Sequence, residues 1–176
     1  MLSRALRLGA LAIGLIAAPA LAGDEVPTTT AAAPLAAPKV IFTSLAAAVA
    51  AQDMVVADEH LRCLASAVYF ESQGQPLPGQ LAVAQVILNR IKSGRFASDV
   101  CGVVKQRGQF GFVRGGQIPA VPESRATWRT AIAVAKVALA DIWAAPVPNA
   151  LYFNGVRAVR VGSRRLAVIG GHAFYR

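Results

Sequence analysis

The sequence predicts an α+β fold that is mainly helical, with a small antiparallel sheet at its C-terminal end. Apolar residues recur at helical spacing before residue 143. Beyond Pro146 and Pro148, short runs of β-branched and aromatic residues alternate with turn residues instead. The chain has 176 residues and 55% of them are hydrophobic, which is sufficient for one ordinary domain.

Four helices are expected in the first part of this domain. Asp58 suits the N-cap of the first helix, and Gly74 and Gly94 suit the ends of the first and second. A glycine-rich loop, 108–116, separates the third helix from the fourth. The expected ranges are 58–72, 78–92, 98–104 and 122–143.

Three short strands are expected to follow. They cover 151–154, 156–161 and 166–175, and the last two are predicted to turn at Gly162-Ser163.

Residues 1–22 are typical of a cleaved signal peptide. Arg4 and Arg7 give a basic start, residues 8–18 form an apolar core, and Ala20-Leu21-Ala22 has the small residues that a signal peptidase requires. The alternative is a short buried helix of the fold. We expect cleavage after Ala22 and a periplasmic or secreted protein.

Residues 23–52 are rich in Ala, Pro and Thr and are predicted to be a linker, so that the folded domain covers 53–176. A short helix is compatible with the end of this linker. The longest apolar stretch, 131–145, is interrupted by Lys136 and Asp141 and is too short for a membrane-spanning helix. We therefore expect no membrane-spanning segment.

The charge is concentrated in residues 61–176, which hold 15 Lys or Arg residues against four acidic ones. Such a balance suits an anionic polymer of the cell envelope, or simply a soluble, arginine-rich surface. Nucleic acid is not expected as a partner, because the sequence has no RRM-like aromatic pair and no helix-turn-helix. It also has no HExxH or other metal signature, so no metal or cofactor is expected.

Glu71 differs from the other three acidic residues of this region, Asp99, Glu123 and Asp141, which are expected near helix ends or in solvent. It follows the apolar run 67–70 and falls at the edge of the buried stripe of its helix. Partial burial and the negative end of the helix dipole both favour a protonated carboxyl group, as a general acid requires. The alternative is an exposed glutamate at a frayed helix end.

The two cysteines, Cys63 and Cys101, have two possible states. In an oxidising compartment they can form a disulfide. Otherwise they are small buried thiols.

Two segments resemble a known family. They are CLASAVYFESQGQPLPGQLAVAQVILNRIKSGRFASDVCGVVKQRGQF, residues 63–110, and the closing GGHAFYR, residues 170–176. Their motifs are similar in order and spacing to the SleB-type cell wall hydrolases, the catalytic domain of spore cortex-lytic enzymes. The resemblance covers about residues 61–176.

This resemblance implies a lysozyme-like α+β fold that cleaves peptidoglycan glycan strands. It implies that Glu71 is the catalytic acid, in a lytic transglycosylase that needs one glutamate. The residues implied to line the cleft and bind substrate are Gln109, Phe110, Tyr152, Asn154, His172 and Tyr175.

The sequence also departs from the family pattern. Gln73 and Gln75 stand where relatives commonly have Arg and a second Glu, which would reduce activity if that second carboxylate assists. Two further cysteines of many exported relatives are missing, which leaves Cys63 and Cys101 as the only possible pair.

Two other functions are compatible with these residues. One is a non-catalytic, cationic peptidoglycan-binding module with a degenerate active site. The other is a peptidoglycan amidase, although the sequence shows neither the metal site nor the nucleophile that it would need.

Overall fold

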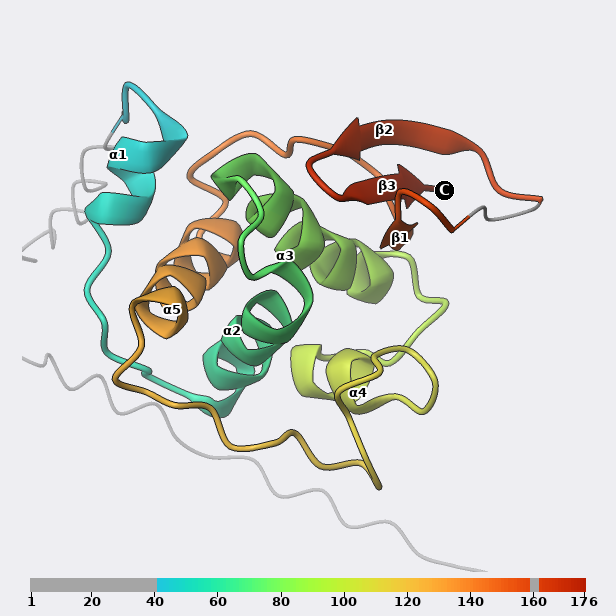
Figure 1. Cartoon of the computed structure of the whole chain (residues 1–176), viewed down its shortest axis with the longest axis horizontal. Helices are drawn as coiled ribbons and strands as arrows, with labels where there is room; N and C mark the ends of the chain where they lie inside the picture. The colour runs from blue at the N-terminus through green and yellow to red at the C-terminus, as the bar shows by residue number, and fades with distance from the viewer. Residues whose placement is uncertain (1–40, 159–161) are drawn as a thin grey trace, which may run out of the picture. The chain divides into compact units, whose positions relative to one another are not determined.

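The structure, a computed structural model, describes residues 41–158 and 162–176. The predicted signal peptide and most of the predicted linker lie outside these residues. In the described part, five helices precede a three-stranded antiparallel sheet (Figure 1). The helices are α1 (Leu45–Ala50), α2 (Glu59–Ser72), α3 (Leu77–Lys92), α4 (Val100–Lys105) and α5 (Ala126–Leu139), and the strands are β1 (Tyr152–Gly155), β2 (Arg165–Ile169) and β3 (His172–Tyr175).

Side-chain caps fix where α2 and α4 begin. The Asp58 carboxylate accepts a hydrogen bond from the Leu61 N–H at 2.8 Å, as expected from the sequence. Asp99 caps α4 in the same way through the Gly102 N–H, also at 2.8 Å. The glycine that ends α2, Gly74, has a left-handed φ of 74°.

Helix α5 is shorter at both ends than the expected 122–143. Residues 122–125 form a turn in which the Arg125 N–H donates to the Pro122 carbonyl oxygen at 3.1 Å, and the helix starts only after it. At the other end Asp141 adopts a φ of 50°, and the Ile142 N–H donates back to the Val137 carbonyl oxygen. This is a Schellman closure, which stops the helix before Trp143.

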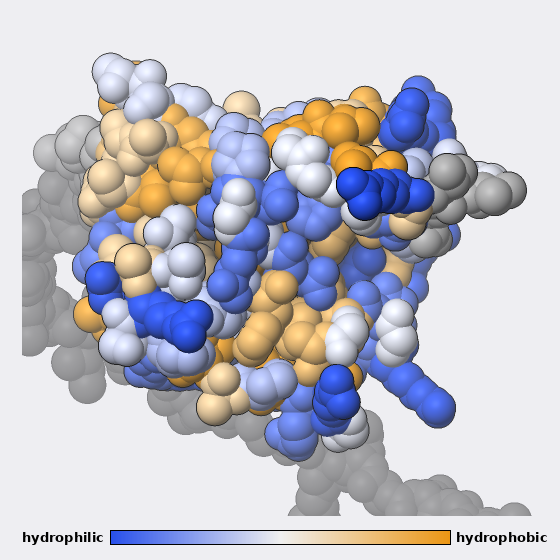
Figure 2. Space-filling view, in the orientation of Figure 1, coloured by the Kyte–Doolittle hydropathy of each residue, from blue (hydrophilic) through white to orange (hydrophobic). Residues whose placement is uncertain are grey.

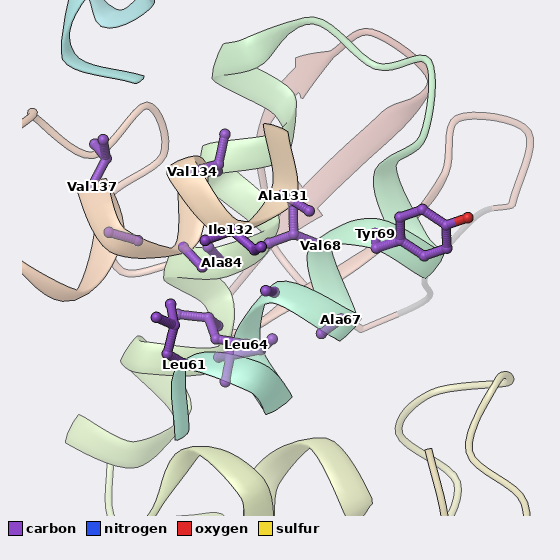
Figure 3. Packing of buried hydrophobic residues seen from close by; sticks show 14 of the residues in the cluster. Leu61, Leu64, Ala67, Val68, Tyr69, Ala84, Ala131, Ile132, Val134 and Val137 are labelled. Atoms are coloured by element: carbon purple, nitrogen blue, oxygen red, sulfur yellow. The ribbon is translucent and has the colours of Figure 1, made fainter. Parts of the chain in front are cut away.

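The main core lies where α2, α3 and α5 meet (Figure 3). Leu64, Leu81 and Val134 are fully buried there. Many of their neighbours are alanines, including Ala84 and Ala131, whose small side chains let the helices approach closely. The high alanine content therefore serves helix packing.

Helix α1 belongs to the same packed unit. Ser44 caps it, accepting from the Ala47 N–H at 3.0 Å. Leu45 and Val49 are buried in the core that α5 shares. The packed unit therefore begins before Asp53, where the sequence placed the start of the domain.

The sheet has the strand order β1-β3-β2 and packs on α3 through Phe174, which is buried against Val83 and Val86. The expected strand 151–154 is confirmed, one residue later, as β1. The expected strand 166–175 is wrong as a single element, because its chain reverses at Gly170-Gly171 to form β2 and β3.

The expected strand 156–161 is also wrong in its described part. Residues 156–158 form a turn, and 159–161 lie outside the described residues. The predicted hairpin at Gly162-Ser163 is consequently replaced by one at Gly170-Gly171, where Gly170 has a φ of 56°. Alternation of apolar residues did not distinguish between these two glycine turns.

Apolar side chains gather over α1 and over part of the sheet, where Val168 of β2 is 53% exposed, and hydrophilic side chains lie to the right of the sheet (Figure 2). In the described part of the chain, none of the helices has the length and apolar character needed to cross a membrane.

A disulfide joins Cys63 of α2 to Cys101 of α4 across 38 residues of sequence. This confirms the pairing expected from the sequence and excludes the alternative of two free thiols. The bond fastens the helix that carries Glu71 to the segment that leads into the loop with Phe110.

Reduction of this disulfide is expected to lower the free energy of unfolding by about 2–4 kcal/mol, because the open chain gains conformational entropy when unfolded. Denaturant unfolding with and without a thiol reductant measures the change. The double variant Cys63→Ala/Cys101→Ala is the control and should not respond to reductant. Equal stability of the native chain in both conditions would contradict the expectation.

Candidate active site

Glu71 lies in the last turn of α2 and is half-buried. It is the only carboxyl group among the described residues that is not exposed. Its neighbour Phe70 stacks on Phe112, with ring centroids 4.7 Å apart. Tyr69 packs edge-on against Trp128 of α5 at 6.0 Å. The backbone that carries Glu71 is therefore anchored by aromatic rings that precede it in the helix.

A continuous row of rings runs from the end of α2 to the sheet. Phe70 stacks on Phe112, which lies 5.6 Å from Phe110. Phe110 lies 6.4 Å from Phe153 of β1, and Phe153 meets the His172 ring of β3 edge-on at 5.2 Å. Segments more than 100 residues apart in sequence are thus brought to one surface beside Glu71.

Arg90 of α3 is the charged group at the centre of this arrangement. Its side chain is only 4% exposed, and its Nε donates a hydrogen bond to the Leu151 carbonyl oxygen at 2.8 Å. The guanidinium lies 5.0 Å from the ring centre of Phe96, 5.4 Å from Phe110 and 5.9 Å from Tyr152. These cation–π contacts replace part of the hydration that the guanidinium loses on burial.

Two opposing effects act on the carboxyl group of Glu71. Burial raises its pKa, because the charged form loses hydration. The positive charge of Arg90 acts in the opposite direction and lowers the pKa, but less strongly. The result is a carboxyl group that holds its proton to a higher pH than usual and can return to the carboxylate form, as an acid that later acts as a base requires.

His172 is the second titratable group of this surface. Burial lowers its pKa, so the imidazole is neutral at neutral pH. Its Nδ1 atom is buried and has no hydrogen-bond partner among the described residues. The ring therefore has an unused polar atom next to the aromatic row.

The residues implied to bind substrate fall into two groups. Tyr152 and His172 are half-buried and lie among the rings near Arg90, whereas Phe110 contacts the Arg90 guanidinium from inside the protein, where it is only 5% exposed. Tyr175 is 4% exposed and pairs with Tyr152 across the sheet, so it is packed inside the protein. Asn154 is half-buried on the face of β1 opposite to Phe153.

Gln109 is half-buried in the turn after α4, next to Phe110. Of the residues implied to bind substrate, Phe110 and Tyr175 are therefore buried, and the other four are half-buried. Their assignment to substrate binding stays a prediction.

Arg90, Phe112 and Phe153 were not among the site residues predicted from the sequence. A signal for Arg90 was present, since it is the first charged residue in a helix that otherwise appears apolar on most sides. No comparable signal marks Phe112 and Phe153, because a lone aromatic residue in a loop or strand is equally compatible with a core position.

A groove of about 200 Å³ opens elsewhere, between α2, α4 and the loop 117–121. Arg62 lines it from α2 and lies nine residues before Glu71, which places it on the opposite side of that helix. Its charged groups pair with each other or with neighbours: Arg62 with Glu123 at 2.8 Å and Lys105 with Glu59 at 3.4 Å. This groove is separate from the site at Glu71.

Comparison with known proteins adds a family match. A family model described as Cell Wall Hydrolase matches residues 74–175, which begin three residues after Glu71. A spore cortex-lytic enzyme of Bacillus cereus is 41% identical over 96 residues, which are 53% of this chain and 33% of that protein. One of Bacillus subtilis strain 168 is 46% identical over 66 residues, 38% of this chain and 22% of that protein. The chain thus spans a third or less of the length of these curated relatives.

Two solved structures are similar over the folded unit. The catalytic domain of Bacillus cereus SleB is 34% identical with a TM-score of 0.53, and the match covers 66% of this chain and 89% of that chain. The catalytic domain of the germination-specific lytic transglycosylase SleB from Bacillus anthracis is 35% identical with a TM-score of 0.54, covering 66% and 93%.

The replacement Glu71→Gln is expected to stabilise the fold at neutral pH. Between pH 4.5, the ordinary pKa of a glutamate, and the raised pKa of Glu71 in the folded protein, this carboxyl group ionises more readily in the unfolded chain than in the folded one. The native protein therefore loses stability as pH rises through this window, and the loss is complete above the folded pKa. The variant lacks this loss, because its amide does not ionise.

Denaturant unfolding of both proteins from pH about 4 to 7 measures the difference. The two free energies of unfolding should converge at the acid end and diverge toward neutrality. Parallel pH profiles would show that burial does not act on this carboxyl group.

Proposed function

The chain belongs to the cell wall hydrolase family, with the mainly helical, lysozyme-like α+β fold of its structural relatives, and we propose that it cleaves the glycan strands of peptidoglycan. The observation that carries this proposal is Glu71, a half-buried carboxyl group with a raised pKa beside an aromatic surface. A sugar ring packs well on aromatic faces, and its glycosidic oxygen needs a proton donor. Glu71 is the proton donor, and the half-buried rings of Phe70 and Tyr152 are the aromatic faces that a sugar ring can reach.

We further propose that the reaction is a lytic transglycosylation, because every carboxyl side chain other than Glu71 in the described part of the chain is exposed. Conventional glycosidases use two carboxyl groups about 5–9.5 Å apart. Glu59 lies 12 residues earlier on α2, or about 18 Å along the helix axis. Asp99 and Glu123 lie beside His60 and Arg62, at the same far end of α2.

A single carboxyl group suffices for the lytic reaction. Glu71 first protonates the glycosidic oxygen, and the bond from that oxygen to C1 of the muramic acid breaks. The resulting carboxylate then takes the proton of the 6-hydroxyl of the same sugar, whose oxygen bonds to C1 and closes a 1,6-anhydro ring. No water is consumed and Glu71 ends protonated, ready for another cycle. The attacking hydroxyl is tethered to the substrate, which gives it a high effective concentration.

The replacement Glu71→Gln is expected to lower the rate of fragment release from purified sacculi by roughly 10²–10⁴-fold, the usual contribution of general acid catalysis. Mass spectrometry of the native digest should show 1,6-anhydro-muramic acid ends. Glu123→Gln is the matched control, because it removes an exposed carboxylate on the opposite side of α2.

Different outcomes separate the alternatives. Reducing-end muramic acid products would replace the lytic reaction with hydrolysis, and cleaved peptide stems would indicate an amidase. Binding to sacculi without release of any fragment would identify a binding module. An active Glu71→Gln variant would remove Glu71 from the mechanism.

We also propose that the protein is exported. The Cys63–Cys101 disulfide supports this, because structural disulfides persist in oxidising compartments. The exported protein is expected to begin at Gly23, and N-terminal sequencing of the periplasmic or secreted material measures this. Replacing Ala22 with Asp should block cleavage, because the peptidase requires a small residue there. An intact Met1 on cytoplasmic protein would contradict the proposal.

A further inference from the structure

We propose that Gln75 is a positioning residue that holds Glu71 and the β2–β3 turn in a fixed relation. This inference rests on the proposed function, since it assigns Gln75 a part in orienting the proposed acid. Gln75 lies in the turn between α2 and α3, four residues after Glu71. Its backbone N–H, its backbone carbonyl oxygen and its side-chain Oε1 each make one hydrogen bond, to α2, to α3 and to the β2–β3 turn.

The backbone of Gln75 connects the two helices. Its N–H donates to the Ser72 carbonyl oxygen at 3.1 Å and so satisfies one of the carbonyls that the end of α2 leaves open. Its own carbonyl oxygen accepts from Nε2 of Gln80 in α3 at 2.9 Å. Ser72 is itself held, because its hydroxyl donates to the Val68 carbonyl oxygen at 2.5 Å. The last turn of α2, which contains Glu71, is thereby closed.

The side chain of Gln75 reaches the sheet. Its Oε1 accepts a hydrogen bond from the Gly171 N–H at 2.7 Å, across 96 residues of sequence. A Cβ added to Gly170 would collide with this Oε1 and come within 2.9 Å of Pro76 Cδ, and a Cβ on Gly171 would come within 3.1 Å of Gln75 Nε2. The amide thus occupies a space that exists only because the turn is a pair of glycines.

Two groups of the site are linked as a result. Gly171 directly precedes His172, and Ser72 directly follows Glu71. Terminal turns of helices and tips of hairpins are the parts of a fold that open most easily. One glutamine fastens both, so the orientation of the Glu71 carboxyl group relative to the aromatic surface depends on it.

The test compares Gln75→Met with Gln75→Glu in the full chain. Methionine keeps the length of the side chain and removes the acceptor, whereas glutamate keeps an oxygen that the Gly171 N–H can reach. In Gln75→Met we expect hydrogen exchange of the Gly171 amide to rise about tenfold, the equivalent of one hydrogen bond. On soluble glycan strands we expect kcat to fall by about tenfold with KM within about twofold, since substrate contacts remain. Gln75→Glu should restore both values to within about threefold.

Two further variants make the comparison selective. Gln52→Met is the matched control, because the Gln52 amide also makes a side chain–backbone hydrogen bond, but its Nε2 donates to the Ala48 carbonyl oxygen at 2.9 Å, at the end of α1. It should change neither exchange at Gly171 nor kcat. Gly171→Ala disturbs the same contact from the Gly171 side and should lower kcat in the same way. This second variant tests the proposal if Gln75→Met does not fold.

The outcomes separate this inference from the proposed function. If the native protein releases no fragments, the proposed function is wrong. If the Gly171 amide still exchanges faster in Gln75→Met, the hydrogen bond from Gln75 to the sheet is supported all the same. Active native protein with unchanged kcat in Gln75→Met or Gly171→Ala overturns the positioning role. A rise in KM at constant kcat also overturns it, because it would make Gln75 a substrate contact.

Discussion

The guanidinium of Arg90 lies inside the protein, where a charge is tolerated only if protein groups replace its lost water. The replacement comes from parts of the chain that are otherwise independent. Phe96 follows α3, Phe110 follows α4, and Tyr152 begins the sheet, preceded by the Leu151 carbonyl that accepts the Nε proton. Helices, loop and sheet are therefore arranged around one cation. A lysine would lack the planar face that meets several rings at once.

Burial and the charge of Arg90 together set the pKa of Glu71. Glu71 loses hydration at the end of α2 and is drawn toward its neutral form, while the charge of Arg90 limits that shift. A carboxyl group held by such opposing effects can both release and recover a proton, which is what a single-residue mechanism requires. Burial also lowers the pKa of His172, so its imidazole is neutral at neutral pH beside the rings.

Helix α2 is fixed at both ends, and the two ends use different chemistry. At its start, Asp58 caps the first turn, and the Cys63–Cys101 disulfide holds the helix against α4. At its end, hydrogen bonds of Gln75 close the last turn and reach the sheet. Covalent and capping constraints suit the structural end of the helix. At the other end, which carries the proposed acid Glu71, a hydrogen-bonded amide holds the last turn without a covalent bond.

The helices could be predicted from the sequence, apart from the ends of α5, because caps, glycine stops and a 3.6-residue apolar period are local properties. The partial burial of Glu71 could be predicted as well, since burial of a helix edge follows from the same period. The pairing of the strands was decided only by tertiary structure: Gly162 and Gly170 both suit a turn, and packing of Phe174 on α3 selected the second. Arg90 and the Gln75–Gly171 contact were likewise decided there, because their partners lie 61 and 96 residues away. Local propensity contains no information on which distant carbonyl or N–H a buried polar side chain will meet.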